Sequence, residues 1–260
     1  MPAAWLVGFW AVLGAAVGSF LNVVVDRLPV GDSIIAPPSH CEACSRRLRP
    51  LEMVPVLSYL LLRGRCRTCG ASVGLRVLVV ELGTGLLFAL LAWRVSLLAP
   101  GGWVSLVLIS AYLAVLVVST ATDLEHGLIL DKVMLPAVAL GLVGSLTAGW
   151  PGLARYLGGG VLGAAVIALI IWVVPGGMGW GDAKLAGFIG LVTGLPGMLF
   201  ALFIAFVMGG VVAGVLMATG RRKRGETIPL GPFLALGGAA TLLFGAELLK
   251  GFYALAEVVG

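Results

Sequence analysis

The chain has 260 residues, of which 60% are hydrophobic and only 11% are charged, and its net charge is +5. A soluble domain carries about 25% charged residues, so this composition excludes an ordinary water-soluble protein and requires lipid as the solvent. In a membrane protein, an excess of Lys and Arg over Asp and Glu indicates which loops face the cytoplasm. We therefore expect no nucleic-acid partner.

Apolar segments long enough to cross a bilayer as helices recur along the chain. The first, residues 3–25, is not preceded by basic residues and is longer than the apolar region of a signal peptide, so it is interpreted as a retained span. The others are residues 77–99, 103–122, 132–149, 154–174, 183–195, 196–219 and 232–258. The pattern predicts an all-α polytopic membrane protein with about eight transmembrane helices.

A polar insertion, residues 26–76, separates the first two predicted spans. It contains two Cys-x-x-Cys pairs, formed by Cys41, Cys44, Cys66 and Cys69. Two such pairs at this distance are typical of a tetrahedral zinc site with thiolate ligands, for which His40 is an alternative ligand. Four cysteines leave no open coordination position, so we expect a structural, zinc-ribbon-like insertion rather than a catalytic metal.

The basic residues gather on one side of the predicted membrane. Eight spans place residues 26–76, 123–132, 175–184 and 220–231 on the same side, together with 14 of the 17 Lys and Arg residues. The positive-inside rule assigns this side to the cytoplasm and both termini to the outside. In the reducing cytoplasm, the four cysteines are not expected to form disulfides.

Two aspartates stand beside predicted spans on this cytoplasmic side. Asp123 follows the segment 103–122, and Asp182 ends the sequence Gly179-Trp-Gly181-Asp. Two carboxyl groups brought together can share one proton, so that one acts as general base on water and the other as general acid. The pattern therefore predicts aspartyl proteolysis, with Gly179 and Gly181 allowing a close approach of backbone and substrate.

Each of these residues also has a simpler interpretation. Asp182 fits the N-terminus of a helix as a capping residue, and Asp123 fits a loop at the membrane surface. Lys184 is expected to pair with a substrate carboxylate or to contact lipid or solvent. Glu81 lies within a predicted span and is expected to face the bundle interior, where it meets a substrate amine or an arginine.

Four stretches in order along the chain resemble the bacterial prepilin peptidases, which are GxGD-type membrane aspartyl proteases. These are GSFLNVV at 18–24 followed by RLP at 27–29, the zinc loop around residues 54–66, GWGDAKL at 179–185, and IPLGPFLALGG at 228–238. The resemblance covers nearly the whole chain. It implies that Asp123 and Asp182 are the catalytic pair and that Asp131 closes the first catalytic motif, where Leu130 stands in place of the usual Pro.

The resemblance also implies substrates and cofactors. The family cleaves type IV prepilins or pseudopilins after a Gly at the cytoplasmic face of the bacterial inner membrane. Many members then methylate the new N-terminus with S-adenosylmethionine, an activity linked to the cysteine-bearing part of the chain. No methyl-donor site is assigned here.

Together these observations predict two regions. Residues 1–99 form an N-terminal membrane region with the four-cysteine loop, and residues 100–260 form the peptidase domain. The alternative is a non-catalytic membrane transporter with a zinc-stabilised loop, in which the acids serve as a proton relay.

Overall fold

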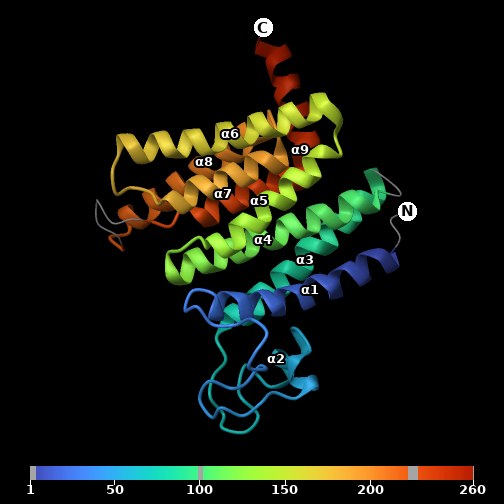
Figure 1. Ribbon diagram of the computed structural model, residues 1–260, viewed down its shortest axis with the longest axis vertical. Coiled ribbons are helices and arrows are strands. Elements are labelled where there is room, and N and C mark those ends of the chain that lie inside the picture. Colours follow the sequence, from blue (N-terminus) through green and yellow to red (C-terminus); the bar gives the residue numbers. More distant parts are fainter. Residues whose placement is uncertain (1–3, 99–101, 222–227, 260) are drawn as a thin grey trace. The chain divides into compact units, whose positions relative to one another are not determined.

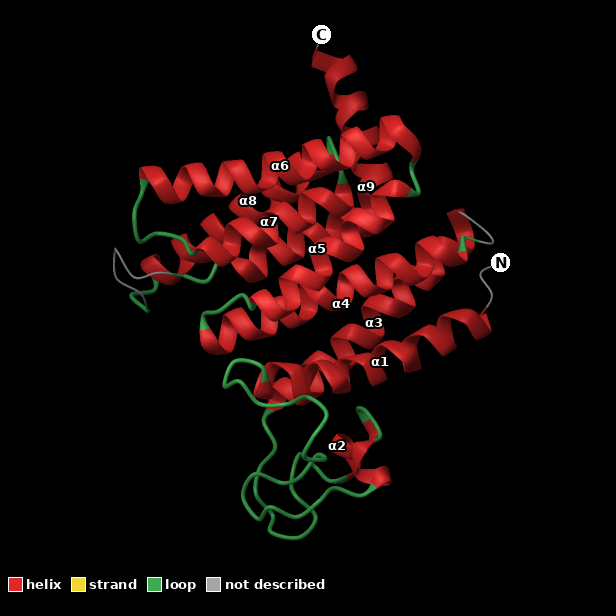
Figure 2. Cartoon of the chain, viewed as in Figure 1, coloured by secondary structure: helices red, strands yellow, loops and turns green. Residues whose placement is uncertain are grey.

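The computed structural model describes residues 4–98, 102–221 and 228–259. In these ranges the chain forms helices joined by loops, and the only β-pairing is two isolated bridges in the cysteine insertion (Figure 2). The prediction of an all-α fold is confirmed. The chain divides into two compact units, Met1–Val118 and Ser119–Gly260, which are described separately.

The helices follow the predicted apolar segments closely. In chain order they are α1 (Ala4–Arg27), the short 3-10 helix η1 (Pro50–Met53), α2 (Leu57–Leu61), α3 (Leu75–Leu98), α4 (Trp103–His126), α5 (Asp131–Leu146), α6 (Gly149–Val173), α7 (Trp180–Thr193), α8 (Gly197–Ala218) and α9 (Gly231–Val259).

Six of these helices are long and apolar enough to cross a membrane, namely α1, α3, α4, α6, α8 and α9. About eight spans were predicted. The two remaining predicted spans, residues 132–149 and 183–195, correspond to α5 and α7, which have 16 and 14 residues. At about 1.5 Å per residue they are roughly 24 and 21 Å long, which is shorter than a hydrocarbon core of about 30 Å.

In unit 1, α1 packs along α3 (Figure 1). The contact is close because α1 presents glycines: a Cβ atom added to Gly14 would lie 2.7 Å from the Cβ of Phe88, and one added to Gly18 would lie 2.8 Å from the Cα of Glu81. Small residues allow helices to approach in lipid, where dispersion contacts replace the hydrophobic effect. The first part of α4 joins this unit through a hydrogen bond from Trp10 Nε1 to Ser110 Oγ, 2.9 Å long.

In unit 2, the short helix α7 lies at the centre and contacts α5, α6, α8 and α9. Nine of its 14 residues are buried. A helix that is apolar on all sides and covered by neighbours does not need the length of a lipid-facing span. Its closest contact is with α6, where Gly190 faces the backbone of Gly159, and Gly163 faces the backbone of Ala186.

We expect Gly190→Ala to destabilise unit 2 by at least the 1–3 kcal/mol that is typical of overpacking, because its methyl group would collide with backbone atoms of Gly159 that cannot rotate away. Thermal unfolding in detergent measures the effect. Gly210→Ala in α8 is the matched control, since nothing lies within 4 Å of its added Cβ. Equal unfolding temperatures for the two variants would contradict this account of the α6–α7 contact.

Candidate active site

Asp123 lies in the last turn of α4 and is buried, with 8% of its surface exposed. The helix ends because Gly127 adopts a left-handed conformation (φ +64°) and its N–H donates to the carbonyl oxygen of Asp123 at 3.0 Å. Glycine favours this helix-ending turn because it has no Cβ. The turn fixes the backbone of Asp123 at the end of the helix.

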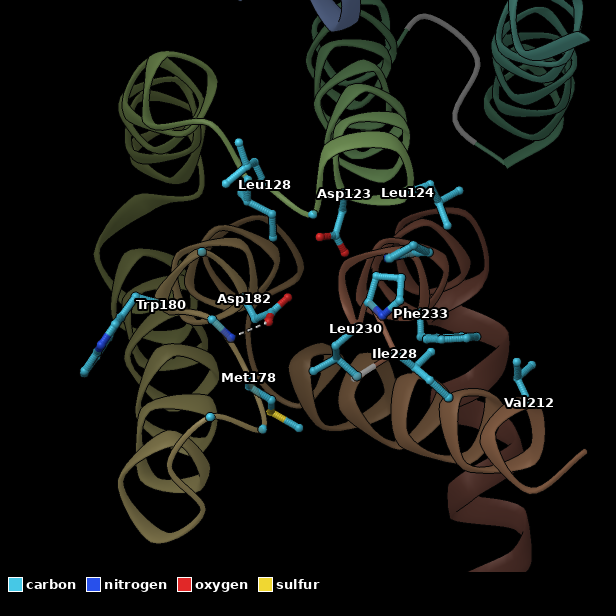
Figure 3. A pocket seen from close by; sticks show the side chains of 18 of the residues that line it. Asp123, Leu124, Leu128, Met178, Trp180, Asp182, Val212, Ile228, Leu230 and Phe233 are labelled. Atoms are coloured by element: carbon cyan, nitrogen blue, oxygen red, sulfur yellow. Dashed lines mark hydrogen bonds between the residues drawn. The ribbon is translucent and has the colours of Figure 1, made fainter. Parts of the chain in front are cut away.

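Asp182 occupies the third position of α7 and is buried to the same extent. The N-cap residue is Gly179, whose backbone N–H donates to Asp182 Oδ2 at 3.1 Å. The carboxyl group thus satisfies a free amide at the start of the helix without being the N-cap itself. This contact uses one oxygen and leaves Oδ1 on the side of Asp123 (Figure 3).

Both aspartates line one cavity of about 930 Å³ within unit 2 (Figure 3). This volume is at the upper end of the range of ligand pockets, roughly 300–1,000 Å³. The wall around the two carboxyl groups is largely apolar. It includes Leu124, Leu128, Ile129, Met178, Trp180, Val212, Leu216, Ile228, Leu230 and Phe233.

The sequence did not single out Gly231, which positions Asp123. Its N–H, at the start of α9, donates to Asp123 Oδ2 at 3.0 Å. A Cβ atom at this position would lie 2.5 Å from the same oxygen. Gly231 belongs to the glycine-rich stretch 228–238, which is identifiable as a motif from the sequence. The sequence does not indicate that Gly231 contacts Asp123, which lies 108 residues earlier.

The other residues of the GxGD motif have distinct roles. A Cβ atom added to Gly181 would lie 2.9 Å from the Cβ of Ile129, so this glycine lets α7 pack against the loop between α4 and α5. At Gly179 the nearest atom would be Asp182 Oδ2 at 3.8 Å, which is an ordinary contact. Gly181 is therefore required by packing within the chain, whereas Gly179 leaves room at the cavity wall.

Lys184 and Asp131, which the sequence treated separately, form an ion pair with Nζ and Oδ1 2.5 Å apart. The pair is about half exposed and links the first turn of α5 to α7, away from the cavity lining. Leu130, just before α5, has φ −80° and ψ 125°, a conformation that proline also adopts. The chain turns at this point without the proline that is usual in the family its motifs resemble.

Glu81 belongs to unit 1 and is not part of this cavity. It is buried in α3, and its Oε2 accepts a hydrogen bond of 2.7 Å from the backbone N–H of Val56. The partner in the structure is thus a loop amide of the same chain. Neither an arginine nor a substrate is needed to account for the buried carboxylate.

The two cysteine pairs converge as a metal site would require. The four Sγ atoms all lie within 4.8 Å of one another, and those of Cys41 and Cys69 are 3.8 Å apart. Tetrahedral zinc with Zn–S bonds of about 2.3 Å places its sulfurs about 3.8 Å apart, so the four thiols fit this ion. Backbone N–H groups of Cys69 and Thr68 lower the pKa of Cys66 to about 6, which favours the thiolate that zinc binds.

The two pairs have the same local structure. In each, the N–H of the first cysteine donates to the carbonyl five residues later: Cys41 to Arg46 at 2.9 Å and Cys66 to Ala71 at 2.8 Å. In the first pair, Arg46 also forms a bidentate ion pair with Glu52, at 2.9 and 3.0 Å. That contact lowers the pKa of Glu52 to about 2 and ties the first pair to η1.

The fold and the site define an all-helical, multi-span membrane protein with two buried carboxyl groups in one cavity. Comparison with known proteins narrows this class. Residues 12–95 match the Bacterial Peptidase A24 N-terminal domain, and residues 108–214 match the Type IV leader peptidase family. No solved structure matches the chain.

Several relatives are similar over nearly their whole length, and each is named a prepilin leader peptidase/N-methyltransferase. That of Burkholderia pseudomallei (strain 1026b) is 36% identical, over 94% of this chain and 87% of the relative. Those of Pseudomonas putida and Bacillus subtilis (strain 168) are 33% and 32% identical, over 95% and 93% of this chain and 94% and 95% of the relatives. The chain belongs to the prepilin leader peptidase/N-methyltransferase family, and these matches give no support to the alternative of a transporter.

We expect Gly231→Ala to lower peptidase activity by about 100-fold, because its methyl group would push the Asp123 carboxyl out of position and misplacement by about 1 Å has an effect of this size. The rate of leader-peptide cleavage is the measurement. Gly245→Ala, in the same helix, is the control, since its nearest contact would be an ordinary 3.8 Å. Wild-type activity in Gly231→Ala would show that this hydrogen bond does not position Asp123.

Proposed function

We propose that this chain is a membrane aspartyl endopeptidase that removes the basic leader of type IV prepilins or pseudopilins, cutting after Gly. The observation that carries the proposal is the placement of two buried carboxyl groups, Asp123 and Asp182, on one cavity. The chain's family and the names of its relatives support the reaction and the class of substrate.

The geometry is suited to a shared-proton mechanism. One carboxyl group holds a proton while the other, ionised, removes a proton from water as the water attacks the scissile carbonyl. The first group protonates the amine as it leaves, and the proton taken from water restores the pair. Gly231 and Gly179 each bind one oxygen of a carboxyl group, so the other oxygen can contact water or substrate.

The cavity wall fits the substrate proposed. A prepilin continues after its cleavage site as a hydrophobic helix, and the wall formed by Val212, Leu216, Ile228 and Phe233 is apolar. Gly179 leaves space beside Asp182. A substrate with glycine at the cleavage site has no side chain there, so its backbone can approach the carboxyl groups closely.

For the topology, we propose that α5 and α7 complete eight crossings as short helices, α7 being enclosed by its neighbours, which places both aspartates at the cytoplasmic face of the bacterial inner membrane. The clustering of 14 of 17 basic residues on that side supports this orientation. Arg222, Lys223 and Arg224, which contribute to that cluster, lie outside the described residues.

For the second activity, we propose that residues 1–99 support N-methylation by S-adenosylmethionine and residues 100–260 support cleavage. The two family matches, residues 12–95 and 108–214, support a division near this point. Cys41, Cys44, Cys66 and Cys69 would hold zinc as a structural ion that closes the insertion. No residue is assigned to the methyl donor.

Asp123→Asn and Asp182→Asn are each expected to lower prepilin cleavage by about 100- to 10,000-fold, because an amide cannot exchange the proton and positioned acid–base catalysis contributes about 10²–10⁴-fold. Cleavage of a prepilin by protein in membranes, followed by gel shift, measures the loss. Asp32→Asn, a change of the same chemistry at an exposed residue, should retain full activity. Normal cleavage by both active-site variants would exclude the aspartyl mechanism.

Cys66→Ser is expected to reduce bound zinc from about one ion per chain to a small fraction, because it removes one of four ligands. Metal analysis of the purified protein gives the stoichiometry. Methylation should fall with the zinc content, while cleavage by the aspartate pair should persist. Thr68→Ser alters the same cysteine pair without removing a ligand and should keep its zinc; equal zinc in both variants would contradict the assignment.

A further inference from the structure

The cysteine insertion carries an exposed apolar surface that neither the zinc site nor the peptidase site explains. Four leucines form this leucine face: Leu51 of η1, and Leu57, Leu60 and Leu61 of α2. Their exposed fractions are 82%, 54%, 57% and 74%, respectively. In α2 the spacing i, i+3, i+4 places the three leucines on one side of the helix. Such a cluster on a soluble surface marks an interaction site.

The start of α2 is attached to a membrane span. Glu81 of α3 accepts the hydrogen bond from Val56 N–H at 2.7 Å. At Val56 the chain makes a tight turn with φ +62°, in which Leu57 N–H donates to Pro55 O at 2.6 Å. A β-branched residue rarely adopts a positive φ, so surrounding contacts must hold this turn in place. The hydrogen bond to the buried Glu81 carboxylate is one such contact.

This attachment fixes how far α2 reaches along the span. Arg76 at the start of α3 pairs with Asp26 at the end of α1, with Nη2 and Oδ1 2.5 Å apart, and we take this partly exposed pair at the ends of two candidate spans as the level of the membrane surface. Glu81 is five residues further along α3, which is about 7.5 Å at 1.5 Å per residue. Helices that lie in a membrane interface bury their apolar side about 5–10 Å deep.

Charge at both ends of the segment fits the same position. Arg49 precedes η1, and Arg63 and Arg65 follow α2; all three are exposed. Arginines that flank an apolar helix can reach phosphate groups while the leucines enter the acyl region. The cytoplasmic leaflet, on which the topology places this insertion, carries anionic lipids.

We propose that the leucine face lies in the lipid interface of the cytoplasmic leaflet, so that η1 and α2 form an interfacial anchor tethered to α3 through the Glu81–Val56 hydrogen bond. The occupant is anionic phospholipid, because the segment is bounded by two spans of its own chain and is held at interfacial depth. The anchor would hold the two cysteine pairs close to the membrane surface.

Photo-crosslinking of the full chain tests this placement. A benzophenone amino acid replaces Leu61 in protein reconstituted into nanodiscs of phosphatidylethanolamine and phosphatidylglycerol. After irradiation, mass spectrometry should find phospholipid adducts at residue 61 at least tenfold above those at Ala43, an exposed control position in the first cysteine pair. Zinc content confirms that both labelled proteins are folded.

The tether is tested in the same assay. Glu81→Ala removes the acceptor for Val56 N–H and should lower the adduct yield at residue 61 by about fivefold, whereas Glu81→Gln keeps an acceptor oxygen and should retain the yield. Cross-links only to a second copy of the chain or to an added pilin peptide would overturn the lipid assignment, as would an equal yield at Ala43. An unchanged yield in Glu81→Ala would overturn the tether. None of these outcomes depends on peptidase activity.

Discussion

A carboxylate within or beside a membrane span must find its hydrogen-bond donors inside the protein, because lipid offers none. Three buried carboxylates of this chain meet that constraint in the same way. Asp123, Asp182 and Glu81 each accept a backbone N–H from a point where a helix begins: Gly231 at α9, Gly179 at α7 and Val56 at α2. Helix starts are the places where free amides occur in a helical protein.

At Asp123 this constraint also requires glycine as the donor residue. At Gly231 the amide approaches the Asp123 carboxyl group to 3.0 Å from a direction in which a Cβ atom would collide with the accepting oxygen. The short helix α7 depends on glycine in the same manner, because its contact with α6 brings Gly190 against Gly159 backbone to backbone. The position of Asp182 therefore depends on packing about two turns further along α7.

The sequence predicted much of this arrangement. The apolar segments predicted the helices, the Cys-x-x-Cys spacing predicted the convergence of four thiols, and the resemblance led to Asp123 and Asp182. Contacts between distant residues could not be predicted: Gly231 with Asp123, and Lys184 with Asp131, are 108 and 53 residues apart. The lengths of α5 and α7 could not be predicted either: 16 and 14 residues are shorter than an ordinary span, and in α7 the apolar residues are buried by neighbouring helices, a setting that hydropathy cannot distinguish from lipid.

The cysteine insertion shows how a small polar segment can be ordered without a core of its own. Its two halves repeat one turn, in which the first cysteine of each pair bonds to the carbonyl five residues later, and the residues before them form matching bridges, His40 with Arg47 and Arg65 with Ser72. Two copies of a turn that each present two thiols create a four-ligand site by convergence. Such a segment cannot bury all of its apolar side chains, and the leucines of α2 are exposed. Because the segment is hydrogen-bonded to a candidate membrane span through Glu81, the nearest apolar surface that can cover these leucines is the bilayer.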